Sequence, residues 1–298
     1  MLEQPSQTQQ PPQTSEGGAV VGPDNAELFA TFRSAADSLT HEWGFVVVRT
    51  AYVANEATDE QQWAVALGRL RAHALPRDED AEMDPGTLAF PVIAHRSILG
   101  GASYDTVRTA FKAWFDDYVR HKQQRQQELS TESDEEEKEA WESDVRRDCF
   151  LVVDETALAS LLQAPDEPVR RVLLRSTTTA GGGVGNVEPF VVVVDATDPR
   201  SVPYGGGGPY TGWMRVYAAS LSQLANDLDS GNSIDELCPA REYLGQIPLY
   251  DGSPCGKLID PPGGTEGRYK FPKGTPRGIQ AAKAMLEEIE RATGGAFM

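Results

Sequence analysis

The sequence predicts an α+β domain built on a ferredoxin-like sheet, in which two split β-α-β units interlock. Runs of three and four consecutive valines within 43–52 and 189–195 predict strands that are buried on both faces. The strong elements also follow one another in the order β-α-β-β-α-β. In that arrangement the first and third strands are central, and the second and fourth strands lie at the edges of the sheet.

Hydrophobic periodicity and local signals justify the elements in the first half of the chain. Apolar residues recur every three to four positions in the predicted helices. Thr58 and Gln61 have the spacing of a capping box, and Ser103 is a predicted N-cap. Pro91 has no backbone N–H to donate, so its strand is predicted at a sheet edge. The expected elements are a helix near 25–39, a strand at 43–52, a helix at 59–74, a strand at 88–94 and a long inserted helix at 103–124.

The second half supplies the other β-α-β unit, with a strand at 149–154, a helix at 155–163 and a strand at 189–195. The outer edge of this last strand is apolar, and a bare apolar edge pairs readily with other chains. We therefore expect the segment 212–216, GWMRV, or another chain to pair with it. A helix that begins at Ser220 is expected to follow.

Three segments are predicted to lie outside this sheet. Residues 1–23 are rich in Gln, Pro, Ser and Thr and are expected to form a disordered tail. The stretch 128–144 has a net charge of −8, so residues 128–146 are expected to form a solvated acidic insertion. The main domain then extends over 24–230. Residues 231–298 are expected to form an irregular Gly/Pro-rich extension that ends in a helix.

The net charge of the whole chain argues against two classes of binding partner. Its 298 residues carry 45 acidic and 27 basic side chains, a net charge of −18. Nucleic acids and anionic membranes both require a concentrated basic face, so neither is expected as a partner. The N-terminal residues lack the pattern of a signal peptide, and the three cysteines fit no disulfide framework. These features predict a cytoplasmic protein.

No pattern in the sequence predicts a cofactor. The glycine-rich stretch 181–185 precedes a strand instead of opening a helix, so it lacks the geometry of a phosphate-binding loop. The four histidines show neither an i, i+4 pair nor an H-E-x-x-H pattern. We therefore expect no cofactor and no metal site.

Five groups of residues form a series along the chain. They are W-G-F-x-x-x-R-T-x-Y at 43–52, D-x-x-x-W at 59–63, G-A-S-x-D-x-V-R-x-x-F-x-x-W at 101–114, a hydrophobic strand followed by D-E-x-A-L at 152–158, and G-W-M-x-V at 212–216. In this order the series resembles a large family of uncharacterised fungal proteins. The resemblance covers roughly 43–225, and it implies no activity and no catalytic residues, because none is established for that family.

Five residues are candidates for a pocket. Arg49, Tyr52 and Arg215 lie on or beside presumed central strands. Arginines in such places usually form structural ion pairs, but they also line anion pockets. Trp114 and Tyr118 belong to an aromatic stripe on the long helix, whose simplest role is core packing. A pocket wall or a dimer contact is the other use of such aromatic residues.

A second candidate is the local basic cluster ahead of the final predicted helix. Such a cluster can provide a local anion contact or pair internally with the acidic stretch, although plain solubility is its simpler role. This cluster consists of Arg268, Lys270, Lys273 and Arg277.

The sequence favours one function over an alternative. Because no catalytic constellation is visible, we expect a binding or regulatory protein that presents its sheet to a protein partner or to a second copy of itself. The alternative is an enzyme of fungal specialised metabolism that takes an apolar small molecule into a cleft between sheet and helix, with Arg49, Tyr52 or Arg215 as polar contacts. A closed apolar cavity around Arg49 would favour the enzyme.

Overall fold

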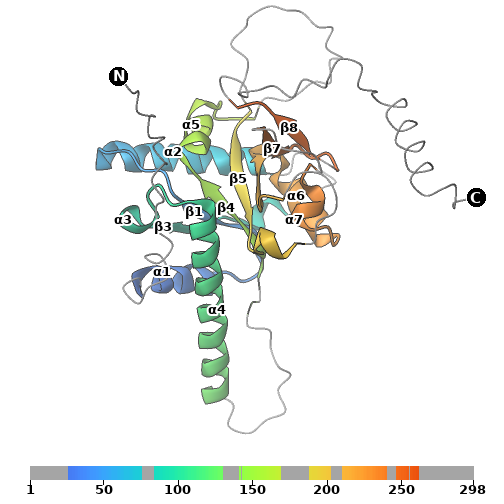
Figure 1. Cartoon of the computed structure of the whole chain (residues 1–298). Coiled ribbons are helices and arrows are strands. Elements are labelled where there is room, and N and C mark those ends of the chain that lie inside the picture. Colours follow the sequence, from blue (N-terminus) through green and yellow to red (C-terminus); the bar gives the residue numbers. More distant parts are fainter. Residues whose placement is uncertain are drawn as a thin grey trace, which may run out of the picture.

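A single mixed sheet with helices on both faces forms the described part of the chain in the computed structural model (Figure 1). The structure describes residues 26–75, 84–129, 141, 143–168, 188–202, 210–239, 246–254 and 256–261. The strands are β1 (Trp43–Arg49), β2 (Leu88–Ala89), β3 (Val92–Ala94), β4 (Asp144–Val153), β5 (Phe190–Asp195), β6 (Trp213–Tyr217), β7 (Ile247–Tyr250) and β8 (Lys257–Ile259). The helices are α1 (Ala26–Asp37), α2 (Glu56–Ala74), α3 (Arg96–Leu99), α4 (Tyr104–Leu129), α5 (Glu155–Gln163), α6 (Leu221–Asp229) and α7 (Ile234–Leu237), with short 3₁₀ turns η2 (Pro85–Thr87), η3 (Pro199–Ser201) and η4 (Ala218–Ser220).

The strands are arranged around β1. Their order across the sheet is β2, β1, β4, β5, β6, β7 and β8, and β3 follows β2 along the same edge of β1. β1 runs parallel to β2, β3 and β4, whereas β5 is antiparallel to both of its neighbours. β7 is parallel to β6 and antiparallel to β8. The prediction of a mixed α+β fold is therefore confirmed.

The ferredoxin-like split arrangement is not confirmed. It would place the segment 88–94 beside β4 and would place β5 beside β1. Instead, β2 and β3 pair with β1, and β5 pairs with β4. The reason is the role of α4, which was expected as an insertion in a turn. A helix that connects two strands allows the second strand to run in the same direction as the first. α4 connects β3 to β4, and β3 is parallel to β1, so β4 is also parallel to β1.

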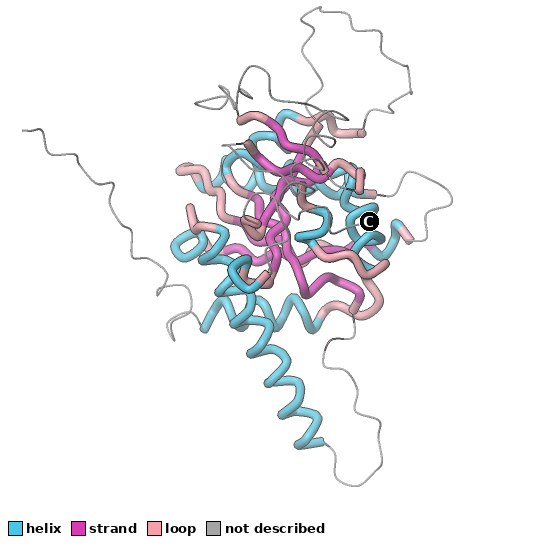
Figure 2. The backbone as a smooth tube through the Cα atoms, turned by 45° about the vertical axis from the view of Figure 1, so that its right-hand side comes forward, coloured by secondary structure: helices cyan, strands magenta, loops and turns pink. Residues whose placement is uncertain are grey.

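Two apolar layers cover the sheet because alternate residues of a strand point to opposite faces. Phe45 and Val47 of β1 belong to the layer under α2, α5, α6 and α7. Val46 and Val48 belong to the layer under α1 and α4. Figure 2 shows the strands between these helices, and both views show the C-terminal half of α4 extending beyond the sheet.

Two predictions about sheet edges are confirmed. The segment that contains Pro91 forms two short strands that pair only with β1 among the described strands. The 212–216 segment pairs with β5 as β6, from Trp213 to Tyr217. The apolar edge of β5 is therefore covered within the chain.

Several boundaries differ from the prediction. The acidic insertion was expected to continue to residue 146, but β4 begins at Asp144, and Trp141 and Val145 are buried in the layer under α1 and α4. Burial of these two apolar side chains outweighs the surrounding charge. The Asn55 side chain, and not a Thr58 capping box, caps α2 by accepting from the Thr58 N–H at 3.0 Å.

The extension after residue 230 was expected to be irregular, yet it contains α7, β7 and β8. Apolar residues of β7 continue the sheet beyond β6, and Tyr250 is fully buried. The tail at 1–23, the glycine-rich stretch 181–185 and the final predicted helix lie outside the described residues. So do the basic residues Arg268, Lys270, Lys273 and Arg277.

The close approach of β2 to β1 gives a test of this topology. Gly44 has a φ of 138°, and a Cβ on it would lie 2.1 Å from the carbonyl oxygen of Ala89. Gly44→Ala is therefore expected to lower the free energy of unfolding by about 3 kcal/mol, measured by urea denaturation.

The matched control for this prediction is Gly68→Ala. Gly68 is exposed in α2, and a Cβ there meets no atom within 4 Å. This change is expected to raise stability by roughly 0.5–1 kcal/mol, because alanine favours helix. Equal stability of Gly44→Ala and the unmodified protein would contradict the β1–β2 pairing.

Candidate functional site

Arg49 lies at the carboxyl end of β1, where its guanidinium is held between two aromatic rings. The guanidinium carbon is 4.4 Å from the centroid of Tyr52 and 4.7 Å from that of Trp63. Its Nε donates to the carbonyl of Ala51 at 3.0 Å. Its Nη2 lies 2.5 Å from Oδ1 of Asp59, in an ion pair that lacks the alignment of a hydrogen bond. Arg49 is only 5% exposed, so these contacts are internal.

Asp59 connects this arginine to the start of α3. Its carboxylate accepts the backbone N–H of Val53 at 2.6 Å and the Nη2 of Arg96 at 2.8 Å. Arg96 also donates to the carbonyl of Val53 at 2.7 Å. Burial raises the pKa of Tyr52, whose hydroxyl donates to the carbonyl of Arg49 at 3.1 Å. The cluster therefore joins β1, α2 and α3.

Trp114 and Tyr118 lie on the other face of the sheet, in the layer beneath α1. Both rings contact Phe32, with centroid distances of 6.1 and 6.3 Å. Tyr118 also meets Trp141 edge to face at 5.6 Å. Burial raises the pKa of Tyr118. These contacts are those of core packing, the simplest role predicted for the stripe.

Arg215 lies on β6, and its guanidinium carbon is 4.2 Å from the ring centroid of Phe190. Its Nη2 donates to Oγ1 of Thr156 at 3.3 Å. Burial lowers its pKa, against the opposing influence of Asp154, which accepts the hydroxyl of Tyr104 at 2.6 Å. The five predicted pocket residues therefore lie in three separate places: Arg49 with Tyr52, Trp114 with Tyr118, and Arg215 by itself.

A second buried arginine, Arg108 on α4, was not among the predicted site residues. Its Nε donates to the carbonyl of Asp195 at 2.7 Å, and its Nη2 donates to the carbonyl of Gly212 at 2.9 Å. Its Nη1 pairs with Asp105. Arg108 and Gly212 both occur in the motifs quoted above, so these motifs meet in space. Nothing local in the sequence reveals this, because the partners are far apart in the chain.

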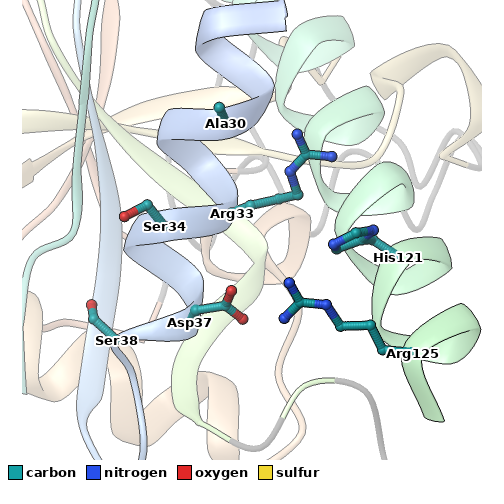
Figure 3. Close-up of a pocket in the computed structure, with 7 residues that line it drawn as sticks. All are labelled: Ala30, Arg33, Ser34, Asp37, Ser38, His121 and Arg125. Atoms are coloured by element: carbon teal, nitrogen blue, oxygen red, sulfur yellow. The ribbon is translucent and has the colours of Figure 1, made fainter. Parts of the chain in front are cut away.

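An open groove of about 590 Å³ lies between α1 and the C-terminal half of α4. Figure 3 shows Arg33 and Asp37 on α1 and His121 and Arg125 on α4 pointing toward one another across it. The remaining lining residues are Ala30, Ser34 and Ser38. We call these seven residues the α1–α4 groove.

The charges of the α1–α4 groove are only partly balanced. Arg33 pairs with Asp117 at 3.2 Å, and Lys122 pairs with Asp37 at 3.0 Å. The hydrogen bond to Asp37 raises the pKa of Lys122. Arg125 forms no ion pair with any residue that the structure describes. The groove is therefore basic on a chain whose overall charge is −18.

One signal for this groove was present in the sequence. His121 and Arg125 are four residues apart, which places them on one face of a helix. Arg33 is about 90 positions away from these two residues in the chain. Only the packing of α1 against α4 brings the three side chains to one groove.

Neither a metal centre nor a membrane-spanning helix occurs in the part of the chain that the structure describes. No three His, Cys, Asp or Glu side chains in this part are grouped so that they would hold a metal ion. None of its helices is long and apolar enough to cross a lipid bilayer. No protein-family model, curated protein or solved structure matches the chain.

The Arg49 cluster yields a prediction about stability. Asp59→Ala removes the carboxylate that faces two arginines and leaves Arg49 buried without its counterion. We expect the free energy of unfolding to fall by about 3–5 kcal/mol, measured by chemical denaturation.

Asp166→Ala is the matched control, because it removes a carboxylate that is 86% exposed and paired with Arg69. Its cost is expected to stay below about 1 kcal/mol. If Asp59→Ala lowered the free energy of unfolding no more than Asp166→Ala, the Arg49 cluster would not stabilise the fold.

Proposed function

We propose that this protein is a binding module that recognises an acidic segment of a protein partner through the α1–α4 groove. The observation that carries the proposal is the basic lining of the groove, where Arg33, His121 and Arg125 converge from two helices. Arginine guanidinium groups suit carboxylates because their donors match the two carboxylate oxygens.

The charge distribution along α4 supports this partner class. From Tyr118 to Arg125 the helix carries three Arg or Lys residues and a histidine but no acidic residue. In a chain with a net charge of −18, such a patch is a local exception. Complementary charge on a partner would steer its approach to this patch, while the rest of the surface repels acidic molecules.

The shape of α4 also supports a binding role. The helix has 26 residues, which corresponds to a length of about 39 Å. Its C-terminal half extends beyond the sheet in both views (Figures 1 and 2). One side of this half is therefore available to a partner.

The contacts of Arg49 favour binding over the alternative of an enzyme with a cleft between sheet and helix. That alternative needs Arg49, Tyr52 or Arg215 as polar contacts for a substrate. Arg49 and Tyr52 direct their polar atoms to internal partners, and Arg215 stacks on Phe190. We also propose a cytoplasmic setting, which the free, buried thiol of Cys149 supports.

Peptide binding provides the test. A fluorescein-labelled Glu/Ser peptide is expected to bind the full chain, with a dissociation constant on the order of 10–100 μM at low salt. The double variant Arg33→Ala/Arg125→Ala is expected to weaken binding at least tenfold, because it removes two guanidinium groups of the groove. Fluorescence anisotropy measures both constants, and binding should weaken as salt screens the charges.

The control is Arg71→Ala, which removes one exposed positive charge from α2, on the other face of the sheet. It is expected to leave peptide affinity unchanged. Equal losses of peptide affinity in Arg71→Ala and the double variant would refute the groove as the site.

Sedimentation of the protein alone gives a second check. A dimer that the double variant dissociates would assign the groove to a second copy of the chain instead of a separate partner.

A further inference from the structure

A second cavity lies near the N-terminal end of α4, away from the α1–α4 groove. Its volume is about 720 Å³, within the range of small-molecule sites. α4, the turn that follows β5 and the start of β6 form its walls. Its lining residues include Asp105, Arg108, Lys112, Asp198, Arg200 and Trp213.

Most of the charges in this cavity are neutralised by its own residues. Arg108 pairs with Asp105, and its other donors bind the carbonyls of Asp195 and Gly212. Arg200 pairs with Asp198 at 3.1 Å. Lys112 is the exception, because it forms no ion pair or hydrogen bond with any described residue. The cavity therefore offers one positive charge to a ligand.

The aromatic wall of the cavity is held in place. Trp213 contacts the ring of Tyr104 at a centroid distance of 5.0 Å. Tyr210 donates its hydroxyl to Oδ2 of Asp195 at 2.7 Å, and burial together with this carboxylate raises the pKa of Tyr210 strongly. Tyr210 and Pro199 also line the cavity beside Trp213.

From these features we infer that the cavity binds a small organic anion with a planar apolar body and a single acidic group. The apolar body would lie against Trp213 and Pro199, and the acidic group would pair with Lys112. A carboxylate or a sulfonate satisfies this description, since either carries one negative charge. A ligand with two or more negative charges would find no second unpaired cation in the cavity, because Arg108 and Arg200 are already paired with Asp105 and Asp198.

The test uses 1-anilinonaphthalene-8-sulfonate, an anion with a planar naphthalene ring and one sulfonate group, with the full chain. Its fluorescence is expected to rise on binding, with a dissociation constant on the order of 10–100 μM. Lys112→Ala is expected to weaken binding about five- to tenfold, because the ligand loses its counterion. Lys112 is exposed, so this variant is expected to keep the thermal stability of the parent protein.

Two controls make the result specific. The uncharged analogue N-phenyl-1-naphthylamine is expected to bind the parent and Lys112→Ala equally, because it has no acidic group. Arg71→Ala, which removes a distant charge, is expected to leave the affinity for the sulfonate unchanged. The inference would be overturned if Lys112→Ala and Arg71→Ala behaved alike, or if the parent bound the sulfonate no better than the uncharged analogue. The peptide assay of the α1–α4 groove uses other residues, so either proposal can fail without the other.

Discussion

The rest of the structure depends on the complete burial of β1. All seven residues of this strand are buried, and both of its edges carry parallel neighbours. A strand that is apolar on both faces requires a layer of helices on each side. α2 and α5 supply one layer, and α1 and α4 supply the other. The positions of these four helices follow from this requirement.

Two buried arginines each connect several helices and strands of the fold. Arg49 joins the carboxyl end of β1 to α2 and, through Asp59, to α3. Arg108 joins α4 to the end of β5 and the start of β6. A guanidinium group has five donors, so it can satisfy several carbonyl and carboxylate groups at once. The motifs that contain these residues thus contribute to the fold through contacts between distant parts of the chain.

The two proposed sites use the charges that the fold does not neutralise. Arg125 in the α1–α4 groove and Lys112 in the cavity beside Trp213 have no counterion among the described residues. Both residues lie on α4, thirteen positions apart. In these two proposals, one helix supplies both the basic surface for a protein partner, near its C-terminal end, and the single positive charge for a small anion, nearer its start. The internal ion pairs around each site limit its net charge, which favours modest affinity with charge selectivity.

The sequence alone determined many of the local elements, although not α7, β7 or β8. The valine runs predicted β1 and β5, Pro91 predicted an edge, and GWMRV was expected beside β5, because these patterns act over a few residues. Strand order depended on the tertiary structure, because α4 was expected as an insertion in a turn but is the crossover helix between β3 and β4. The burial of Trp141 and Val145 likewise depended on partners outside the acidic stretch. The candidate sites were beyond the sequence for the same physical reason: a groove or cavity exists only where side chains from distant segments meet.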